Sequence, residues 1–197
     1  MTSSRKNSSP YSPSSKPPRS FNRKFLYSSI LFVFLGVIAF ITYSIQSESP
    51  EYGFKIPLRE GVHSPPYIYT LDITVENQLK RIPPTSGNHF ETLSPWGFLG
   101  TPVIPENALH NMEHGGVVLW YKPNNPVLAG SVNQLIDQIG RKCMVAGSYK
   151  DMSYEISATV WGRILPLEKF DATQLKDFIA KYRGTQGPEA PLCKSQS

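Results

Sequence analysis

Residues 109–121 have the sequence LHNMEHGGVVLWY, in which a histidine-rich segment leads directly into an apolar one. The five residues Val117–Tyr121 are all apolar, and such a run predicts a buried strand. Pro105 on one side and the glycine pair 115–116 on the other leave room for at most about two helical turns before that strand. The stretch therefore predicts a buried strand that is entered from a short, glycine-ended segment.

Three other segments have strand patterns. Apolar side chains mostly alternate with other residues over residues 67–75, which predicts a strand. Residues 143–146 predict a short strand and residues 155–165 a longer one. By contrast, residues 76–115 show no clear periodicity, and we expect them to form long, structured loops.

Two helices are predicted beyond the buried strand. The first begins near Asn125-Pro126, an N-cap followed by proline at the first helical position, and has helical spacing of its apolar residues Val132, Leu135, Ile136 and Ile139. The second begins after Asp171, where Gln174 completes a capping box, and Gly184 ends it; its apolar face consists of Leu175, Phe178, Ile179 and Tyr182. The expected fold is α+β, with a small sheet, two packed helices and long structured loops, preceded by one transmembrane helix.

Residues 25–46 are predicted to be that transmembrane anchor. No charged residue occurs between Phe25 and Ser47. At about 1.5 Å of rise per residue, the apolar stretch matches the roughly 30 Å hydrocarbon core of a bilayer. A cleaved signal peptide has a shorter apolar region and a small-residue cleavage site, which this sequence does not show. The sequence therefore favours a retained, single-pass anchor in the cell membrane.

Charge sets the expected orientation of the anchor. The chain has a net charge of +5, but six of its 20 basic residues and none of its 15 acidic residues lie in residues 1–24. Basic residues beside a membrane helix stay in the cytoplasm, so we expect a cytoplasmic N-terminus and an extracytoplasmic domain. Beyond the tail the charges nearly balance, which argues against a nucleic-acid partner.

These patterns divide the chain into five parts. We expect a disordered basic tail over residues 1–24, the anchor over 25–46, a linker over 47–60, a globular domain over 61–190 and a C-terminal tail over 191–197. Cys143 and Cys193 both follow the anchor. Outside the cytoplasm they can form a disulfide, and the alternative is two separate thiols.

All four histidines precede the buried strand: His63, His89, His110 and His114. If residues 110–114 are helical, His110 and His114 lie one turn apart on one face, where two imidazoles can share a metal ion. His89 lies in a turn-rich segment that can fold over the same place. Glu113 is a candidate ligand, ligand-orienting group or general base. Histidines in such loops can instead form a purely structural hydrogen-bond network.

The spacing H-x-x-E-H at residues 110–114 also matches a metallopeptidase signature. That signature needs a sustained helix and a third ligand, for which the glutamates further along are Glu155, Glu168 and Glu189. None of them lies in a second motif, and the segment is short. The sequence therefore favours a non-enzymatic protein over a peptidase.

Several of these motifs together resemble a known family. The stretches PPTSGNHF (83–90), WGF (96–98), LHNMEHGGVVLWY (109–121), ATVWGRI (158–164), DFIAKYRG (177–184) and GPE (187–189) are similar, in this order, to the bacterial domain-of-unknown-function family numbered 3105. The resemblance implies a membrane-anchored domain and carries no established activity. It puts His63, His89, His110, Glu113 and His114 within the characteristic motifs of that family.

The sequence thus favours a membrane-anchored extracytoplasmic domain that binds a transition metal, zinc or copper. His110 and His114 are the expected ligands, with His89, Glu113 and His63 as the residues that complete the site. The alternative is a metal-free module whose histidines brace loops that bind a partner protein of the envelope. The expected partners are the lipid bilayer, through residues 25–46, and an envelope protein.

Overall fold

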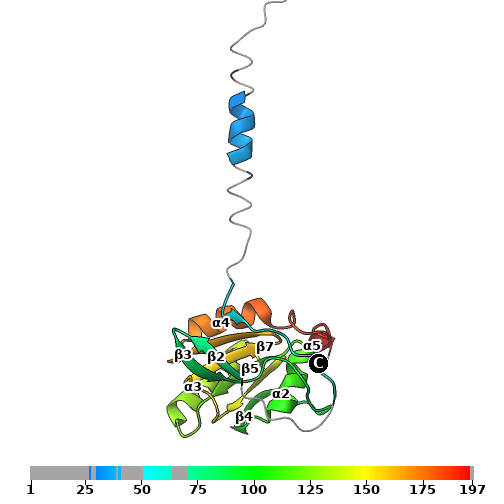
Figure 1. Cartoon of the computed structure of the whole chain (residues 1–197), viewed down its shortest axis with the longest axis vertical. Coiled ribbons are helices and arrows are strands. Elements are labelled where there is room, and N and C mark those ends of the chain that lie inside the picture. The colour runs from blue at the N-terminus through cyan, green and yellow to red at the C-terminus, as the bar shows by residue number, and fades with distance from the viewer. Residues whose placement is uncertain (1–26, 28–29, 39, 41–50, 64–70, 196–197) are drawn as a thin grey trace, which may run out of the picture. The chain divides into compact units, whose positions relative to one another are not determined.

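A computed structural model describes residues 27, 30–38, 40, 51–63 and 71–195, and the chain divides into two units at Pro50 (Figure 1). In the first unit, residues 30–38 are helical and expose their large apolar side chains. Within the described part of the chain, no helix has both the length and the apolar character that a membrane crossing requires. Half of the predicted anchor, residues 25–46, lies outside the described residues, as does the whole basic tail.

The second unit contains a six-stranded mixed sheet with the order β1-β8-β7-β5-β6-β4. These strands span Phe54–Lys55 (β1), Gly97–Pro102 (β4), Val117–Tyr121 (β5), Met144–Ser148 (β6), Ile156–Val160 (β7) and Arg163–Leu167 (β8). β6 runs parallel to both β4 and β5, and the remaining pairs are antiparallel. A separate hairpin joins β2 (Leu71–Val75) to β3 (Gln78–Ile82). Residues 67–70 of the predicted 67–75 strand lie outside the described part.

The described part of the second unit contains four helices: α2 (Pro105–Glu113), α3 (Pro126–Ile139), α4 (Ala172–Tyr182) and α5 (Leu192–Ser195). The two predicted helices begin as expected. The Asn125 side chain accepts from the Leu128 amide at the start of α3, and Asp171 accepts from the Thr173 and Gln174 amides at the start of α4. Because the described residues contain both a mixed sheet and helices, the α+β class is confirmed for them.

Two predictions about this region were wrong. Residues 76–115 are not all loop, because they contain β3, β4 and α2. Residues 155–165 do not form one strand, because the chain reverses at Trp161-Gly162 and pairs β7 with β8. Gly162 has a φ of +70°, a conformation that suits glycine in such a tight turn. Short elements of this kind give too few residues for a periodic pattern to stand out.

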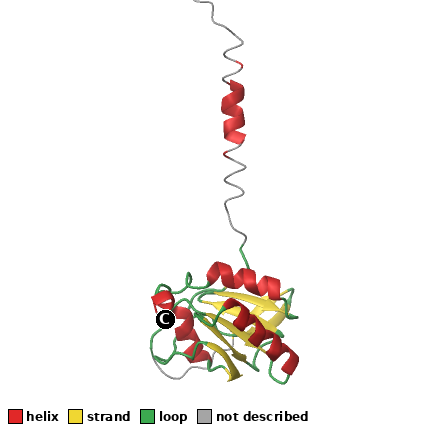
Figure 2. Ribbon diagram, turned by 180° about the vertical axis from the view of Figure 1, so that it is seen from behind, coloured by secondary structure: helices red, strands yellow, loops and turns green. Residues whose placement is uncertain are grey.

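β5 lies at the centre of the sheet and is buried on both faces. Val117, Leu119 and Tyr121 belong to a core cluster with residues of α3 and α4. Val118 and Trp120 belong to a second cluster with residues of α2. Since successive side chains of a strand point to opposite faces, α2 covers one face of the sheet, and α3 and α4 cover the other (Figure 2).

The second unit is longer at both ends than the predicted boundaries 61–190. β1 falls within the predicted linker and pairs with β8. At the other end, Cys193 is 1% exposed and is joined by a disulfide to Cys143, with their Cα atoms 5.6 Å apart. Residues 51–60 and the described residues of the predicted tail are therefore part of the folded unit.

Two glycines test the packing of this fold. A Cβ added at Gly130, on the exposed side of α3, meets nothing within 4 Å, whereas one added at Gly147 in β6 lies 2.6 Å from both Thr101 O and Val103 Cγ2. Gly130→Ala should raise the free energy of unfolding by about 0.5–1 kcal/mol. Gly147→Ala should lower it by about 1–3 kcal/mol. Denaturant unfolding of the two variants measures this, and effects of equal sign would contradict the described packing.

Candidate metal centre

The four histidines, which are all the histidines of the chain, lie together beside α2. The ring centroid of His63 lies 4.9 Å from that of His89 and 5.0 Å from that of His110. The His110 centroid lies 5.3 Å from that of His89 and 4.6 Å from that of His114. Three segments that are distant in the sequence contribute these rings. Chain folding, and not sequence proximity, therefore assembles the cluster.

Helix α2 supplies three of the polar side chains. Pro105 stands in its first turn, and His114 is its C-cap, so His110, Glu113 and His114 are spaced i, i+3 and i+4 on one face. Gly115 follows with a φ of +85°, and the Gly116 amide donates to the Asn111 carbonyl at 2.7 Å. The helix thus ends beside its last two polar side chains, and β5 begins at once.

The remaining motif residues around α2 hold neighbouring loops. The Asn111 side chain donates to Ser94 O at 3.0 Å and accepts from the Ser94 amide at 2.8 Å. A Cβ at Gly116 would lie 2.8 Å from the Trp96 ring, so only glycine lets that ring approach so closely. The H-N-x-E-H-G-G motif therefore combines the polar cluster with the contacts that fix its surroundings.

His89 comes from the buried loop that follows β3. The Thr85 carbonyl accepts from the Gly162 amide at 2.9 Å, and Ser86 Oγ accepts from the Arg59 amide at 3.0 Å. The His89 ring is 1% exposed, and its Nδ1 lies 2.8 Å from Gly87 O. That contact makes Nδ1 the proton-bearing nitrogen and directs Nε2 toward the cluster. An Nδ1–H bonded to a backbone carbonyl is also the usual orientation of a metal-binding histidine.

His63 reaches the cluster through main-chain pairing with the same loop. His63 and His89 form an isolated parallel bridge, the His89 amide donates to Val62 O at 3.2 Å, and Asn88 Oδ1 accepts from the Val62 amide at 3.1 Å. The His63 side chain is 44% exposed. It is thus the cluster imidazole with the most access to solvent.

Glu113 joins the two histidines outside α2. Glu113 Oε2 lies 3.0 Å from His89 Nε2 and 3.5 Å from His63 Nε2. Ligand atoms of these three residues all lie within 4.8 Å of one another. The carboxylate is only 15% exposed, so water screens these contacts weakly.

A second group of donors lies at the end of α2. His110 Nε2 and His114 Nε2 are 3.2 Å apart, and Glu113 has a ligand atom within 4.8 Å of both. Glu189 Oε2 lies 3.1 Å from His114 Nε2. From the sequence, Glu189 is only one of three possible peptidase ligands, because no periodic pattern marks its position. The GPE element of the family resemblance was the available signal.

The segment that carries Glu189 is fixed by main-chain contacts to α2. The Glu189 amide donates to Glu113 O at 3.0 Å, and the Cys193 amide donates to His114 O at 3.0 Å. The disulfide from Cys193 to Cys143 holds the same segment to the residue before β6. Glu189 is therefore positioned by the backbone, although its side chain is 52% exposed.

The donor atoms face one another in a way that calls for a shared cation or proton. With the proton of His89 on Nδ1, its Nε2 lone pair faces a carboxylate oxygen at 3.0 Å. His110 Nδ1 is buried and has no hydrogen-bond partner among the described residues. Burial is the largest cause that lowers the pKa of His110. The neighbouring imidazoles of His114, His89 and His63 lower this pKa further, and Glu113 acts in the opposite direction. A neutral imidazole is the form that binds metal.

The cluster offers nitrogen and oxygen ligands. Cys143 and Cys193 are joined in the disulfide. Met112 is fully buried in the core cluster that α2 shares with β5. Imidazole and carboxylate suit zinc and copper(II), whereas soft sulfur ligands select copper(I). The proximity of Glu189 to His114 favours the peptidase interpretation, which needs a third ligand. Two observations argue against it: His114 lies at the helix C-cap, and Glu113 contacts two imidazoles.

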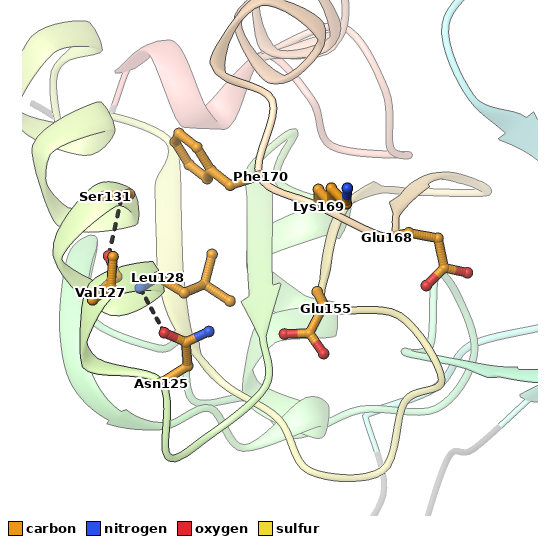
Figure 3. Close-up of a pocket in the computed structure, with 8 residues that line it drawn as sticks. All are labelled: Asn125, Val127, Leu128, Ser131, Glu155, Glu168, Lys169 and Phe170. Carbon is orange, nitrogen blue, oxygen red and sulfur yellow. Dashed lines mark hydrogen bonds between the residues drawn. The ribbon is translucent and has the colours of Figure 1, made fainter.

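A pocket of about 300 Å³ lies at the start of α3, with a different set of residues (Figure 3). Its lining comprises Asn125, Val127, Leu128, Ser131, Glu155, Glu168, Lys169 and Phe170. The two hydrogen bonds drawn there both belong to α3 itself: the Leu128 amide donates to Asn125 Oδ1, and Ser131 Oγ donates to Val127 O. No member of the histidine cluster lines this pocket, and we assign it no ligand.

The fold and the cluster define an α+β domain with a candidate histidine–glutamate metal centre. The chain belongs to the family described as "Protein of unknown function (DUF3105)", whose model matches residues 74–196. The predicted family is thereby confirmed over these residues, and His63 lies outside the matched range. No match was found among the curated proteins or among the solved structures.

The C-terminal segment offers a test of this geometry. A Cβ at Gly187, which has a φ of +115°, would collide with the carbonyl oxygens of Met112 and Glu113. Gly187→Ala should therefore lower the free energy of unfolding by about 1–3 kcal/mol. The neighbouring Gln186→Ala is the control and should change it by less than about 0.5 kcal/mol. Denaturant unfolding with the disulfide oxidised measures both, and an unchanged Gly187→Ala protein would contradict the described seating of this segment.

Proposed function

We propose that this protein is a membrane-anchored extracytoplasmic domain that binds a transition metal ion, zinc or copper(II), through its histidine cluster. His110 and His114 are the central ligands. Glu113 and His89 contribute from the adjoining face, and His63 and Glu189 lie at the exposed edge. The role that follows is accessory: holding or delivering a metal ion in the cell envelope, together with an envelope partner.

The observation that carries this proposal is the convergence of all four imidazoles with Glu113. In addition, His89 Nε2 and Glu113 Oε2, two atoms that each present lone pairs, are 3.0 Å apart. The nitrogens of His110 and His114 are 3.2 Å apart. Bonds of about 2.0–2.1 Å to one tetrahedral ion give ligand-to-ligand distances of roughly 3.3 Å. These spacings support a cation between the donors.

The location of the domain is part of the proposal. The uncharged stretch 25–47 and the exposed apolar side chains of helical residues 30–38 support an anchor in a lipid bilayer. The basic tail supports a cytoplasmic N-terminus. The disulfide supports an oxidising compartment for the domain. In that compartment the cluster can take metal directly from the envelope.

The alternative function is a metal-free interaction module. It is favoured by the contacts that tie the segments of His63, His89 and α2 to one another. In that case the contact of His89 with Glu113 is part of a structural hydrogen-bond network. The histidines then stabilise the loops, and an envelope protein binds the surface that the loops present.

Metal addition separates the two functions. The full-length chain without a histidine tag is purified in detergent, stripped with a chelator and heated with and without zinc or copper(II). Metal at about 100 times its dissociation constant should stabilise the fold by about 2.7 kcal/mol, which raises Tm by roughly 5–10 °C. The double variant His110→Ala/His114→Ala should lose more than about 100-fold of the affinity for the ion that these two residues hold, because even groups that only orient ligands contribute about 10–100-fold.

The matched control is Glu155→Gln/Glu168→Gln, which changes two carboxylates of the pocket in Figure 3 and none of the cluster. It should retain the full shift. An unchanged Tm of the unaltered protein with either metal would reject metal binding. A lower Tm of the histidine variant without any metal effect would then favour the bracing role.

A further inference from the structure

The geometry points to two metal ions in this cluster, bridged by the carboxylate of Glu113. This inference rests on the proposed metal binding and goes beyond it, because it assigns a second site. One ion lies among His63, His89 and Glu113. The other lies among His110, His114 and Glu113, with Glu189 as a further ligand.

The donor atoms of the cluster form two groups that share Glu113. His63, His89 and Glu113 form one group whose ligand atoms lie within 4.8 Å of one another, and His110, His114 and Glu113 form another. Among the described residues, no such group unites all four histidines. Donors of one ion lie at most about 4.2 Å apart, twice the length of a metal–nitrogen bond. Small side-chain movements therefore bring the donors of each group within the distance that one ion requires. Glu113 is common to both groups.

The cluster has more donors than one ion needs. Four imidazoles and the carboxylates of Glu113 and Glu189 give more ligands than the four of one tetrahedral ion. Contacts within each group are short: His89 Nε2 to Glu113 Oε2 is 3.0 Å, and His114 Nε2 to Glu189 Oε2 is 3.1 Å. Each group can thus supply three or four protein ligands, and water can fill a remaining position.

Electrostatic repulsion between two ions also favours a carboxylate that both share. Two cations a few Å apart repel strongly in a poorly solvated site, and a carboxylate between them offsets that repulsion. Glu113 is 15% exposed and lies in both groups, so it is the side chain placed for this task. Its two oxygens allow one bond to each ion. Paired ions held in this way are usually about 3.5–4 Å apart.

The imidazoles of the two sites differ in access to solvent, while the Glu189 side chain of the second site is 52% exposed. His110 and His114 are each 8% exposed, whereas the His63 side chain is 44% exposed. The His63 site should therefore release and take up its ion more readily than the site at the end of α2. A tightly held ion beside an exchangeable one suits a protein that passes metal to a partner.

Metal stoichiometry tests the inference on the full-length, untagged chain with its disulfide intact. The chelator-treated protein is titrated with zinc and freed of excess metal, and the bound zinc is counted. Two equivalents are expected, and zinc X-ray absorption should contain metal–metal scattering near 3.5–4 Å. His63→Ala should bind one equivalent and lose that scattering. His114→Ala should also bind one equivalent, and Glu155→Gln should keep two.

Each outcome has a distinct meaning. One equivalent in the unaltered protein would overturn the two-ion centre and leave the proposed function standing, whereas no bound zinc, and no bound copper(II) in a parallel titration, would overturn both. Two equivalents in His63→Ala as well would overturn the assignment of the outer site. Because the His63 side chain is substantially exposed, His63→Ala remains informative even if His114→Ala fails to fold.

Discussion

Glu113 is the last residue of α2, and its carboxylate contacts imidazoles from two segments that are distant in the sequence. This arrangement depends on a short helix that ends just before the central strand. Gly115 turns the chain through a positive φ, Gly116 admits the Trp96 ring, and β5 enters the core immediately. The buried strand fixes α2 on one face of the sheet, and the end of α2 fixes the cluster.

The C-terminal segment completes the site through the backbone. Residues 184–193 pair with the turn after α2, and the disulfide to Cys143 fastens their far end. Glu189 thereby reaches His114 without a helix or strand of its own. The disulfide thus stabilises the segment that forms one edge of the polar cluster.

The sequence predicted the α+β class, β5, and the starts of α3 and α4, because a continuous apolar run and capping residues act locally. It placed His63, His89, His110, Glu113 and His114 as candidates, and the structure brings them together. It missed β1, β3, β4, α2, α5 and the β7–β8 turn, which are short. It also gave Glu189 no role of its own, since that position depends on main-chain contacts between distant residues. Long-range pairing of this kind leaves no periodic pattern in a single sequence.

The cluster is proposed to hold metal between Glu113 and the imidazoles. Anomalous X-ray diffraction at the zinc absorption edge, from crystals grown with zinc, locates such an ion. Bound zinc should give anomalous peaks within about 2.0–2.1 Å of the ring nitrogens of His110 and His114. Crystals with anomalous peaks only at surface positions away from the cluster, and with His89 still in direct hydrogen-bond contact with Glu113, would contradict it.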